Sequence, residues 1–358
     1  MQTVIEFRHI KKAYGDKVIL KDFNLSVEKG EFVTIIGSSG CGKTTALKMV
    51  NGLLSPTEGE ILINGENIRE KDQTMLRRNI GYAIQGSVLF PHMTVADNVG
   101  YGLKIKKVPK NEIKTRVSEM LKLVQLEGFE KRKPTSLSGG QQQRIAIARA
   151  IVNEPKVLLL DEPLGALDLK LRQDMQYELM RLKEELGITF IYITHDQEEA
   201  LTMSDKIIVM NKGYIQQMGT PEDIYNEPEN AFVADFIGDS NIIDGIMLED
   251  RLVEILGTKF ECVDEGFGRN RPVDVVIRPE DVVLGEEGQG ILDGVVTSLI
   301  FKGVHYEMEV EANGYEWLVH STNCHPVGSK VSISVIPFNI QIMHKPESED
   351  EKAVTIDE

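Results

Sequence analysis

The sequence has little cysteine, and the cysteines follow no pattern. Its 358 residues contain three, Cys41, Cys262 and Cys324, which lie far apart. An odd, widely spaced set without a C-x-x-C pair argues against a disulfide framework and against a zinc site. This usage fits a protein that works in a reducing cytosol.

Long apolar runs are also missing. No stretch approaches the roughly 18 apolar residues that a membrane-spanning helix needs. The first residues, M-Q-T-V-I-E-F-R, lack the apolar core of a signal peptide. We therefore expect that, if this protein acts at a membrane, other chains supply the membrane span.

Positive charge is scarce. Lys and Arg number 40 against 56 Asp and Glu, so the formal net charge is −16. A negative far field argues against a nucleic-acid binder and against a basic membrane-surface protein. Any anionic ligand must therefore be held by local groups. The remaining composition, 41% hydrophobic and 27% charged, is typical of a globular protein of two or three domains.

The hydrophobic pattern of the first 235 residues predicts a mixed α/β structure. Alternating stretches near the N-terminus predict strands, and Asn64-Gly65 is typical of a two-residue hairpin turn. Residues 31–37 indicate a short strand, 44–53 a helix, and 109–129 an amphipathic helix. Three unbroken apolar runs indicate strands buried on both faces, as in a parallel sheet covered by helices; they are residues 156–161, 187–195 and 205–210.

The character of the sequence changes near residue 235. From there, short alternating stretches punctuated by Gly, Pro and Asn predict a small antiparallel β domain. We therefore expect three parts: an α/β domain over residues 1–235, a β-rich domain over 236–345, and an acidic, mobile tail over 346–358.

A glycine-rich stretch, G-S-S-G-C-G-K-T-T, follows the predicted strand 31–37 and opens the next helix. Glycines let successive backbone N–H groups turn inward on phosphate oxygens, and the positive end of the following helix points to the same place. In this pattern Lys43 reaches the β- and γ-phosphates of a nucleotide, and the Thr44 hydroxyl ligates Mg²⁺. A glycine-rich turn with a chance lysine is the alternative, and the flanking strand and helix argue against it. The predicted ATP-binding residues of this loop are Gly37, Ser38, Ser39, Gly40, Cys41, Gly42, Lys43, Thr44 and Thr45.

Cys41 within this loop has two interpretations. A thiolate is electrostatically favoured at a helix N-terminus, which predicts a reactive cysteine whose alkylation blocks nucleotide binding. A small residue that merely fills the loop is the simpler interpretation.

The segment L-L-L-D-E-P puts two carboxylates at the end of an apolar strand. Ligand residues of open α/β sheets lie at the carboxyl ends of strands. We expect Asp161 to hold the magnesium shell and Glu162 to accept a proton from an attacking water. An isolated D-E-P is usually a turn, so this prediction depends on the neighbouring strand and glycine loop.

A second phosphate-binding helix start is predicted at L-S-G-G-Q, residues 137–141, because two glycines after a serine open the helical stretch Q-Q-Q-R-I-A-I-A-R-A-I. One chain thus carries two such cradles. The residues of the second are Leu137, Ser138, Gly139, Gly140 and Gln141.

Together these stretches resemble the ATP-binding cassette (ABC) family from about residue 4 to 235, with the glycine loop as its Walker A motif, L-L-L-D-E as its Walker B motif and L-S-G-G-Q as its signature. The resemblance implies a P-loop core with a helical subdomain at about 91–153. Single residues match further family positions. Tyr14 is similar to the aromatic that stacks on adenine, Gln85 to the glutamine that contacts Mg²⁺ and senses the membrane partner, Asp168 to the end of the D-loop, and His195 to the switch histidine. Each of these four residues, taken alone, could have a purely structural role. Their order and spacing relative to the longer motifs favour the functional role.

The resemblance implies a mechanism. Two copies pair by a two-fold axis, and each ATP is bound between the Walker A loop of one copy and the signature of the other, with Mg²⁺ as cofactor. Binding of ATP closes the pair of copies, and hydrolysis of ATP reopens it.

The resemblance also implies a class of transporter. Exporters commonly fuse a membrane domain to the cassette, so a chain without one favours an importer with separate subunits. That importer has two membrane-spanning permease subunits and an extracytoplasmic substrate-binding protein, and this chain lies peripherally on the cytoplasmic face of the membrane. A soluble ATPase of DNA repair or translation is the distant alternative, disfavoured because no long coiled coil and no second cassette are present.

The predicted β domain resembles the small oligonucleotide-fold-like (TOBE-type) regulatory domain of such importers in V-D-V-V-I-R-P-E-D-V and G-V-V-T-S-L-I-F-K-G. We expect no nucleic-acid partner, because the chain is acidic and poor in aromatics. The junction from residue 221 to 242 is most similar to ATPases of spermidine/putrescine importers, and importers of sugars or ferric iron are the alternative.

Overall fold

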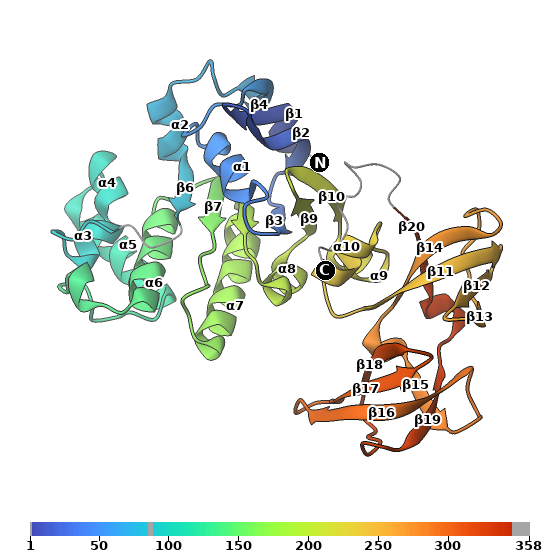
Figure 1. The fold of residues 1–358 in the computed structure, drawn as a ribbon. Coiled ribbons are helices and arrows are strands. Elements are labelled where there is room, and N and C mark those ends of the chain that lie inside the picture. The colour runs from blue at the N-terminus through green and yellow to red at the C-terminus, as the bar shows by residue number, and fades with distance from the viewer. Residues whose placement is uncertain (1, 85–88, 346–358) are drawn as a thin grey trace. The chain divides into compact units, whose positions relative to one another are not determined.

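The computed structural model describes residues 2–84 and 89–345. The chain divides into two compact units, Met1–Glu222 and Asp223–Glu358. The first is α/β and the second consists mainly of antiparallel strands, which confirms the predicted order of fold types (Figure 1).

Unit 1 contains two sheets. The first is antiparallel with the order β2-β1-β4-β5, and its strands are β1 (Thr3–Tyr14), β2 (Lys17–Glu28), β4 (Glu58–Ile63) and β5 (Glu66–Asn67). The predicted hairpin turn is confirmed, because Ile63 pairs with Glu66 across Asn64 and Gly65, which have φ of 53° and 77°.

The second sheet of unit 1 has the order β10-β9-β3-β8-β7-β6. All neighbours from β9 to β6 run parallel, and β10 is antiparallel to β9. Its strands are β3 (Phe32–Gly37), β6 (Ile80–Ala83), β7 (Val157–Asp161), β8 (Thr189–Ile193), β9 (Lys206–Asn211) and β10 (Tyr214–Gly219).

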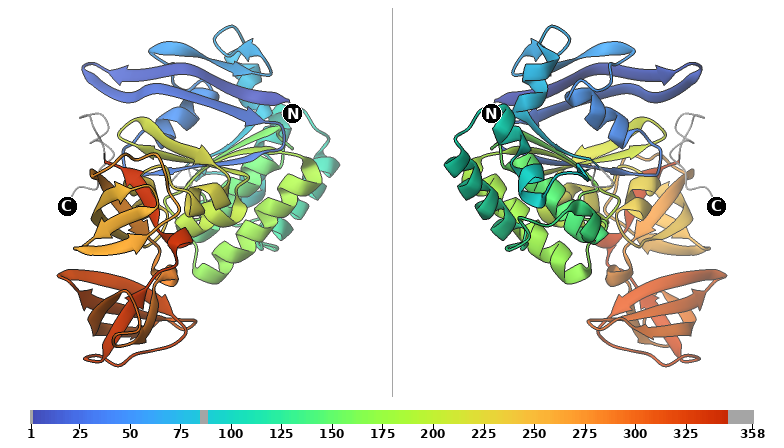
Figure 2. Two further views of the ribbon diagram at one scale, coloured as in Figure 1. Left: turned by 90° about the vertical axis from the view of Figure 1, so that its right-hand side faces the viewer. Right: turned by 90° about the vertical axis from the view of Figure 1, so that its left-hand side faces the viewer.

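Alternate residues of the central strands face two different cores. In β7, Leu159 joins the core that includes α1 (Lys43–Val50) and the antiparallel sheet, whereas Leu158 and Leu160 join a second core with helices from residue 95 onward. The antiparallel strands and the green helices accordingly lie on opposite sides of the parallel sheet (Figure 2). This confirms the prediction that the unbroken apolar runs are strands buried on both faces.

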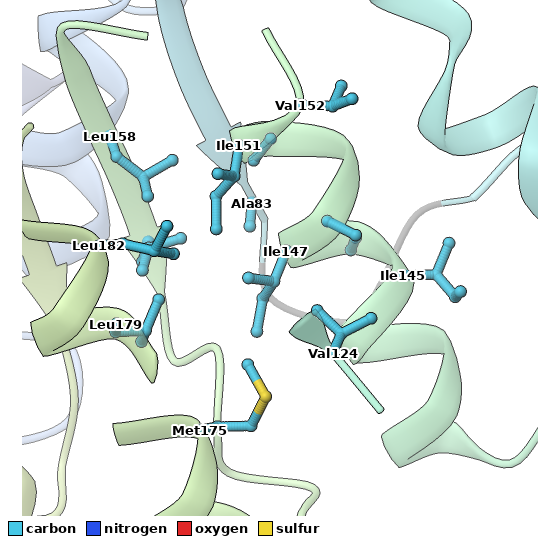
Figure 3. Close-up of a cluster of buried hydrophobic side chains, with 14 of the residues drawn as sticks. Ala83, Val124, Ile145, Ile147, Ile151, Val152, Leu158, Met175, Leu179 and Leu182 are labelled. Carbon is cyan, nitrogen blue, oxygen red and sulfur yellow. The ribbon is translucent and has the colours of Figure 1, made fainter. Parts of the chain in front are cut away.

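The core on the helical side is continuous from the sheet to α6 (Gly139–Ile151) and α7 (Leu169–Leu186). Figure 3 shows Ile147 and Ile151 of α6 facing Leu179 and Leu182 of α7 beside β7. Burying each such side chain contributes about 1.5–3 kcal/mol to stability. This packing fixes where the ends of both helices lie, and the predicted functional residues stand at those ends. The other helices of unit 1 are α2 (Gln73–Asn79), α3 (Val95–Val99), α4 (Tyr101–Ile105), α5 (Lys110–Leu123), η1 (Pro134–Ser136) and α8 (Gln197–Met203).

The amphipathic helix predicted from 109 to 129 is shorter than expected. Helix α5 buries Val117 and Leu121, as the periodicity predicts, but it ends at Leu123. Gln125 has φ of 55°, a left-handed conformation that a right-handed helix does not continue through.

Unit 2 contains two five-stranded antiparallel sheets, ordered β13-β12-β11-β14-β20 and β15-β19-β16-β17-β18, that contribute to one apolar core around the fully buried Trp317. Their strands are β11 (Asn241–Glu249), β12 (Leu252–Ile255), β13 (Thr258–Glu261), β14 (Arg271–Ile277), β15 (Val283–Glu286), β16 (Leu292–Phe301), β17 (Tyr306–Ala312), β18 (Tyr315–Ser321), β19 (Lys330–Ser334) and β20 (Gln341–His344), with the 3-10 turns η2 (Pro279–Asp281) and η3 (Pro337–Asn339).

The boundary between the units lies earlier than the predicted 235/236. Two short helices, α9 (Pro221–Asn226) and α10 (Ala231–Phe236), precede the β-rich part. The buried guanidinium of Arg278 donates hydrogen bonds to the carbonyl oxygens of Tyr225 and Ala234. These bonds and the packing of Ala234 against Val276 attach this segment to β14, so it belongs to unit 2. The predicted tail, 346–358, lies outside the described residues.

Among the helices in the described ranges, none has both the length and the apolar character that crossing a bilayer requires.

Candidate functional site

The glycine loop connects the carboxyl end of β3 to the first residue of α1, Lys43. Gly37 has φ of 155°, and a Cβ there would stand 2.0 Å from the carbonyl oxygen of Met210. Gly42 has φ of 113°, and its Cβ would meet Leu20 at 2.5 Å. Both positions therefore require glycine, and the close approach leaves the loop backbone folded over the start of the helix.

The Lys43 side chain lies along this loop. Its Nζ donates to the carbonyl oxygens of Gly37 and Ser38 at 2.7 and 3.0 Å. The Ser38 hydroxyl donates to Asn211 Oδ1 at 2.9 Å, so the loop is also tied to the end of β9. The ammonium group is thereby held beside the row of loop amides, where the sequence predicted a phosphate cradle.

Cys41 is a buried part of the same loop. It is 3% exposed, and its Sγ lies 3.9 Å from Lys43 Nζ. Burial raises the pKa of the Cys41 thiol, and the Lys43 charge opposes this only in part. Desolvation thus outweighs the helix terminus, and the structure supports the simpler interpretation of Cys41 as a loop filler.

Thr44 and Asp161 meet at the base of the loop. The Thr44 Oγ1 donates to Asp161 Oδ1 at 3.2 Å, and Asp161 is 2% exposed at the end of β7. Burial raises the pKa of Asp161, while the Thr44 hydrogen bond lowers it. A hydroxyl and a carboxylate oxygen at this spacing are the hard ligands that Mg²⁺ prefers, so the residues fit a magnesium ion.

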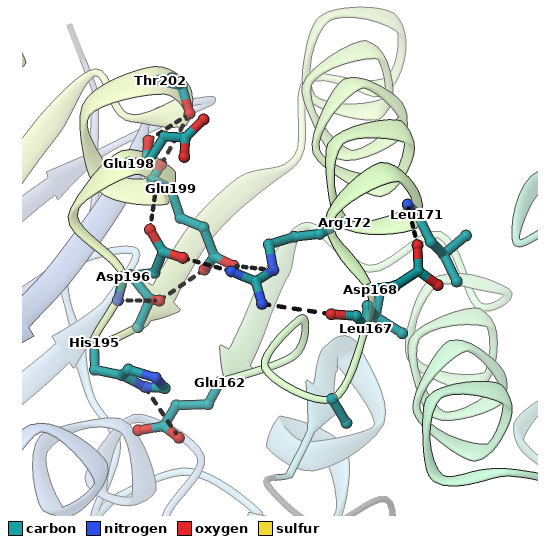
Figure 4. Close-up of polar contacts among 12 residues, drawn as sticks. Glu162, Leu167, Asp168, Leu171, Arg172, His195, Asp196, Glu198, Glu199 and Thr202 are labelled. Atoms are coloured by element: carbon teal, nitrogen blue, oxygen red, sulfur yellow. Dashed lines mark hydrogen bonds and ion pairs between the residues drawn. The ribbon is translucent and has the colours of Figure 1, made fainter. Parts of the chain in front are cut away.

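Glu162 and His195 are brought together from two neighbouring strand ends. Glu162 follows β7, and its N–H donates to the carbonyl oxygen of Ile193 at 2.9 Å. Its carboxylate Oε2 lies 3.6 Å from His195 Nδ1. Figure 4 shows the two side chains pointing toward each other. Because parallel strands end at the same edge of a sheet, the two groups lie on the same edge as Asp161 and the glycine loop.

The signature residues form the N-terminus of α6. The Ser138 hydroxyl accepts from Gln141 N and the Gln141 side chain accepts from Ser138 N, a complete capping box. Gly139 faces open space, whereas a Cβ at Gly140 would lie 3.1 Å from Leu167 and 3.2 Å from the Ala166 carbonyl oxygen. The signature therefore presents one bare backbone face outward and packs the other against the residues before α7.

The two cradles lie apart within one chain. Over residues 2–84 and 89–345, no hydrogen bond joins 37–45 to 137–141. Figure 1 shows α6 grouped with α3, α4 and α5, away from α1.

The remaining predicted residues have simpler surroundings. Tyr14 is 51% exposed at the end of β1, with Lys12 Nζ 4.8 Å above its ring. Asp168 caps α7 by accepting from Leu171 N. Ser39 lies in the loop and Thr45 lies in the first turn of α1. Gln85 lies outside the described residues.

Sequence reasoning missed Gln143, which connects the signature helix to the Walker B end. Its Nε2 donates to the Glu162 carbonyl oxygen at 2.9 Å, and its Oε1 accepts from Ala166 N at 3.2 Å. Its place two residues after the signature gives no sign of these partners. Arg172 of α7 and Glu199 of α8 were also missed, because the sequence does not show which groups a polar residue within a helix bonds.

Comparison with known proteins places these features in a family. A model described as ABC transporter matches residues 20–165, and one described as TOBE domain matches residues 275–339. The chain is 60% identical over 344 residues to the spermidine/putrescine import ATP-binding protein PotA of Clostridium novyi, covering 96% of this chain and 99% of that protein. It is 58% identical over 347 residues to the PotA protein of Acetivibrio thermocellus, covering 97% and 98%.

Solved structures agree with this for the first part of the chain. A dimeric post-hydrolysis state of the ATP-binding cassette MJ0796, bound to ADP and Pi, aligns with a TM-score of 0.58 and 37% identity, covering 61% of this chain and 98% of that one. The cbiO1 protein of Clostridium perfringens, part of an ABC transporter complex, aligns with a TM-score of 0.59 and 33% identity, covering 63% and 92%.

Proposed function

Because the chain belongs to the ABC transporter family, we propose that it is the ATP-hydrolysing subunit of an importer for the polyamines spermidine and putrescine. The observation that carries the proposal is its similarity to spermidine/putrescine import ATP-binding proteins over nearly the full length, β-rich unit included. The site supports the ATPase part of it, because the groups for binding and for cleaving a nucleotide stand at one edge of one sheet.

The glycine loop holds the phosphates of ATP in this proposal. The amides of residues 37–45 donate to phosphate oxygens, and Lys43 exchanges its loop carbonyls for the β- and γ-phosphates. Tyr14 stacks on the adenine ring. Thr44 and Asp161, together with Gln85, would hold Mg²⁺, which would supply positive charge beside the phosphates. Asp161, already at the end of its strand, needs no large movement for this role.

Cleavage depends on Glu162 and His195. Glu162 accepts a proton from the water that attacks the γ-phosphate, and such a base is worth roughly 10²- to 10⁴-fold in rate. His195, 3.6 Å from Glu162 Oε2, orients the water and the γ-phosphate. Both groups lie at the same edge of the sheet as the glycine loop, which supports this role.

A second copy of the chain completes each site. The outward face of Leu137–Gln141 offers donors that its own glycine loop does not use, and a two-fold pairing presents them to the partner's nucleotide. The D-loop ending at Asp168 lies beside the signature through the Gly140 contact and shares this interface.

We assign the remaining partners from the same family. Two membrane-spanning permease subunits and an extracytoplasmic substrate-binding protein complete the importer, and the chain binds at the cytoplasmic face of the membrane. Unit 1 acts as the motor, and unit 2, which begins at Asp223 rather than at the predicted residue 236, acts as the regulatory domain.

Reconstitution tests the proposal. The full chain is assembled with its permease subunits in liposomes, and ATP hydrolysis is measured with the binding protein loaded in turn with spermidine, a sugar or ferric iron. We expect spermidine to stimulate hydrolysis and to be taken up. Stimulation by a sugar or by ferric iron instead would reassign the substrate, and absence of hydrolysis under every condition would contradict the ATPase assignment.

A further inference from the structure

Arg172 lies one turn into α7 and contacts two loops at once (Figure 4). Its Nη2 donates to the Leu167 carbonyl oxygen in the D-loop at 3.4 Å. Its Nη1 donates to Asp196 Oδ2 at 2.7 Å, immediately after His195. One side chain therefore connects the D-loop to the loop that carries the switch histidine.

The loop that carries His195 is anchored from below by Glu199. This carboxylate is 2% exposed, and its Oε2 accepts from both the Tyr192 hydroxyl and the Thr194 hydroxyl at 2.7 Å. Burial raises the pKa of Glu199, whereas the hydrogen bonds from Thr194 and Tyr192 lower it, and the charge of Arg172, whose Nε lies 3.9 Å from Oε1, lowers it to a smaller extent. A buried carboxylate is costly without such partners, so Arg172 and the two hydroxyls hold it in place.

His195 itself has little that fixes it. Its side chain is 66% exposed, and its described contact is the one to Glu162. Its neighbours on both sides are fixed, because Thr194 bonds Glu199 while Asp196 bonds Arg172 and caps α8 by accepting from Glu199 N. The backbone on either side of His195 therefore sets where its ring points.

We infer that Arg172 is a positioning residue, which ties the D-loop to the switch loop and so sets the position of His195 relative to Glu162. The connection continues to the signature, because Gly140 packs on Leu167 and Gln143 bonds both Ala166 and Glu162. A displacement of the signature by a partner copy is thus transmitted to His195 through Arg172. The inference rests on the proposed ATPase function.

The test compares two arginines of the same helix. Arg172→Ala removes the bridge. Arg181→Ala is the control, because among the described residues the ion pairs of Arg181 are with Glu178 and Glu185 of its own helix. We expect Arg172→Ala to lower kcat about tenfold with KM for ATP changed less than twofold, since small misplacements of a catalytic group cost up to about 10²-fold. Arg181→Ala keeps the wild-type kcat. Arg172→Lys, which retains the charge but not the fork, recovers part of the loss.

Hydrogen–deuterium exchange gives a readout that does not depend on hydrolysis. We expect Arg172→Ala to speed amide exchange in residues 163–168 and 194–199 and to leave the rest of unit 1 unchanged; Arg172→Lys serves if the alanine variant does not fold. The positioning role would be overturned by unchanged amide exchange in those two segments or by faster exchange throughout unit 1. It would also be overturned if Arg172→Ala changed only KM for ATP and left kcat as in wild type. A wild-type chain that binds ATP without hydrolysing it would contradict the proposed function instead, while the exchange result would still decide the structural link.

Discussion

At the scale of single residues, the proposed base and the switch histidine are held in different ways. Glu162 has φ of 47°, a left-handed conformation that costs roughly 1–3 kcal/mol for a residue other than glycine and persists only where the surroundings enforce it. The bonds of its N–H to Ile193 and of its carbonyl oxygen to Gln143 do so. His195 depends on its loop. Substitutions at Glu162 therefore test the chemistry, and substitutions around His195 test placement.

Two substitutions separate nucleotide binding from cleavage. We expect Glu162→Gln to retain ATP binding and to lose hydrolysis by at least about 10²-fold, because the amide cannot accept the proton. Lys43→Ala should weaken ATP binding itself, since it removes the charge beside the phosphates. Binding is measured with a fluorescent ATP analogue and hydrolysis by phosphate release. Turnover of Glu162→Gln within twofold of wild type would show that another group is the base.

The burial of Cys41 predicts an order of thiol reactivity. Because burial raises the pKa of Cys41, little thiolate is present at neutral pH, whereas Cys324 is exposed. We expect iodoacetamide to modify Cys324 first and Cys41 slowly, with the rate at Cys41 rising with pH. Peptide mass spectrometry after timed quenching measures both sites. Faster labelling at Cys41 than at Cys324 would mean that the thiolate is stabilised after all.

At the scale of elements, the sequence predicted the strands and turns whose own residues carry a local signal. The Asn64-Gly65 turn and the doubly buried strands follow from chain-local chemistry. The end of α5 at Leu123 does not follow from such a signal, because it depends on the left-handed conformation of Gln125. The attachment of α9 and α10 to unit 2 does not either, because it depends on the buried side chain of Arg278.

In the site, the sequence motifs identified the groups that face a ligand. Gln143 and Arg172 bond other parts of the protein, and polar residues within a helix carry no sign of such partners.

Arg278 predicts how α9 and α10 are attached. It is 3% exposed, and its guanidinium donates to carbonyl oxygens of Tyr225 and Ala234 and to the Ser240 hydroxyl. We expect Arg278→Ala to destabilise unit 2 by about 3 kcal/mol, because several buried acceptors lose their donor. Urea unfolding of the full chain measures this, with Arg271→Ala, an exposed arginine at the start of β14, as control. Equal midpoints for the two variants would contradict the role.

At the scale of the whole molecule, the proposed mechanism gives the chain two half-sites, one at the start of α1 and one at the start of α6. The glycine loop with Asp161 and Glu162 belongs to one, and the signature to the other. A chain whose formal charge is −16 gains no long-range attraction between copies, so we expect the nucleotide held between them to contribute much of the pairing. Association should therefore require ATP and should persist when hydrolysis is blocked.

Complementation between two inactive variants tests whether the half-sites come from different copies. Lys43→Ala has a damaged glycine loop and an intact signature, whereas Ser138→Arg has the reverse, and each alone is inactive. In a mixed pair, the glycine loop of the Ser138→Arg copy faces the signature of the Lys43→Ala copy, which restores one site of two. Since random mixing makes half of the pairs mixed, we expect about a quarter of the wild-type hydrolysis rate if the sites act independently, from the two-fold geometry. Phosphate release from equimolar mixtures measures this, and each variant mixed with itself is the control. A mixture as inactive as each variant alone would have two explanations: one chain must supply both half-sites, or neither site works without the other.

Sedimentation of the Glu162→Gln variant with ATP separates these two explanations. A nucleotide-bound dimer would support coupled sites, and a monomer would contradict a site shared between two copies.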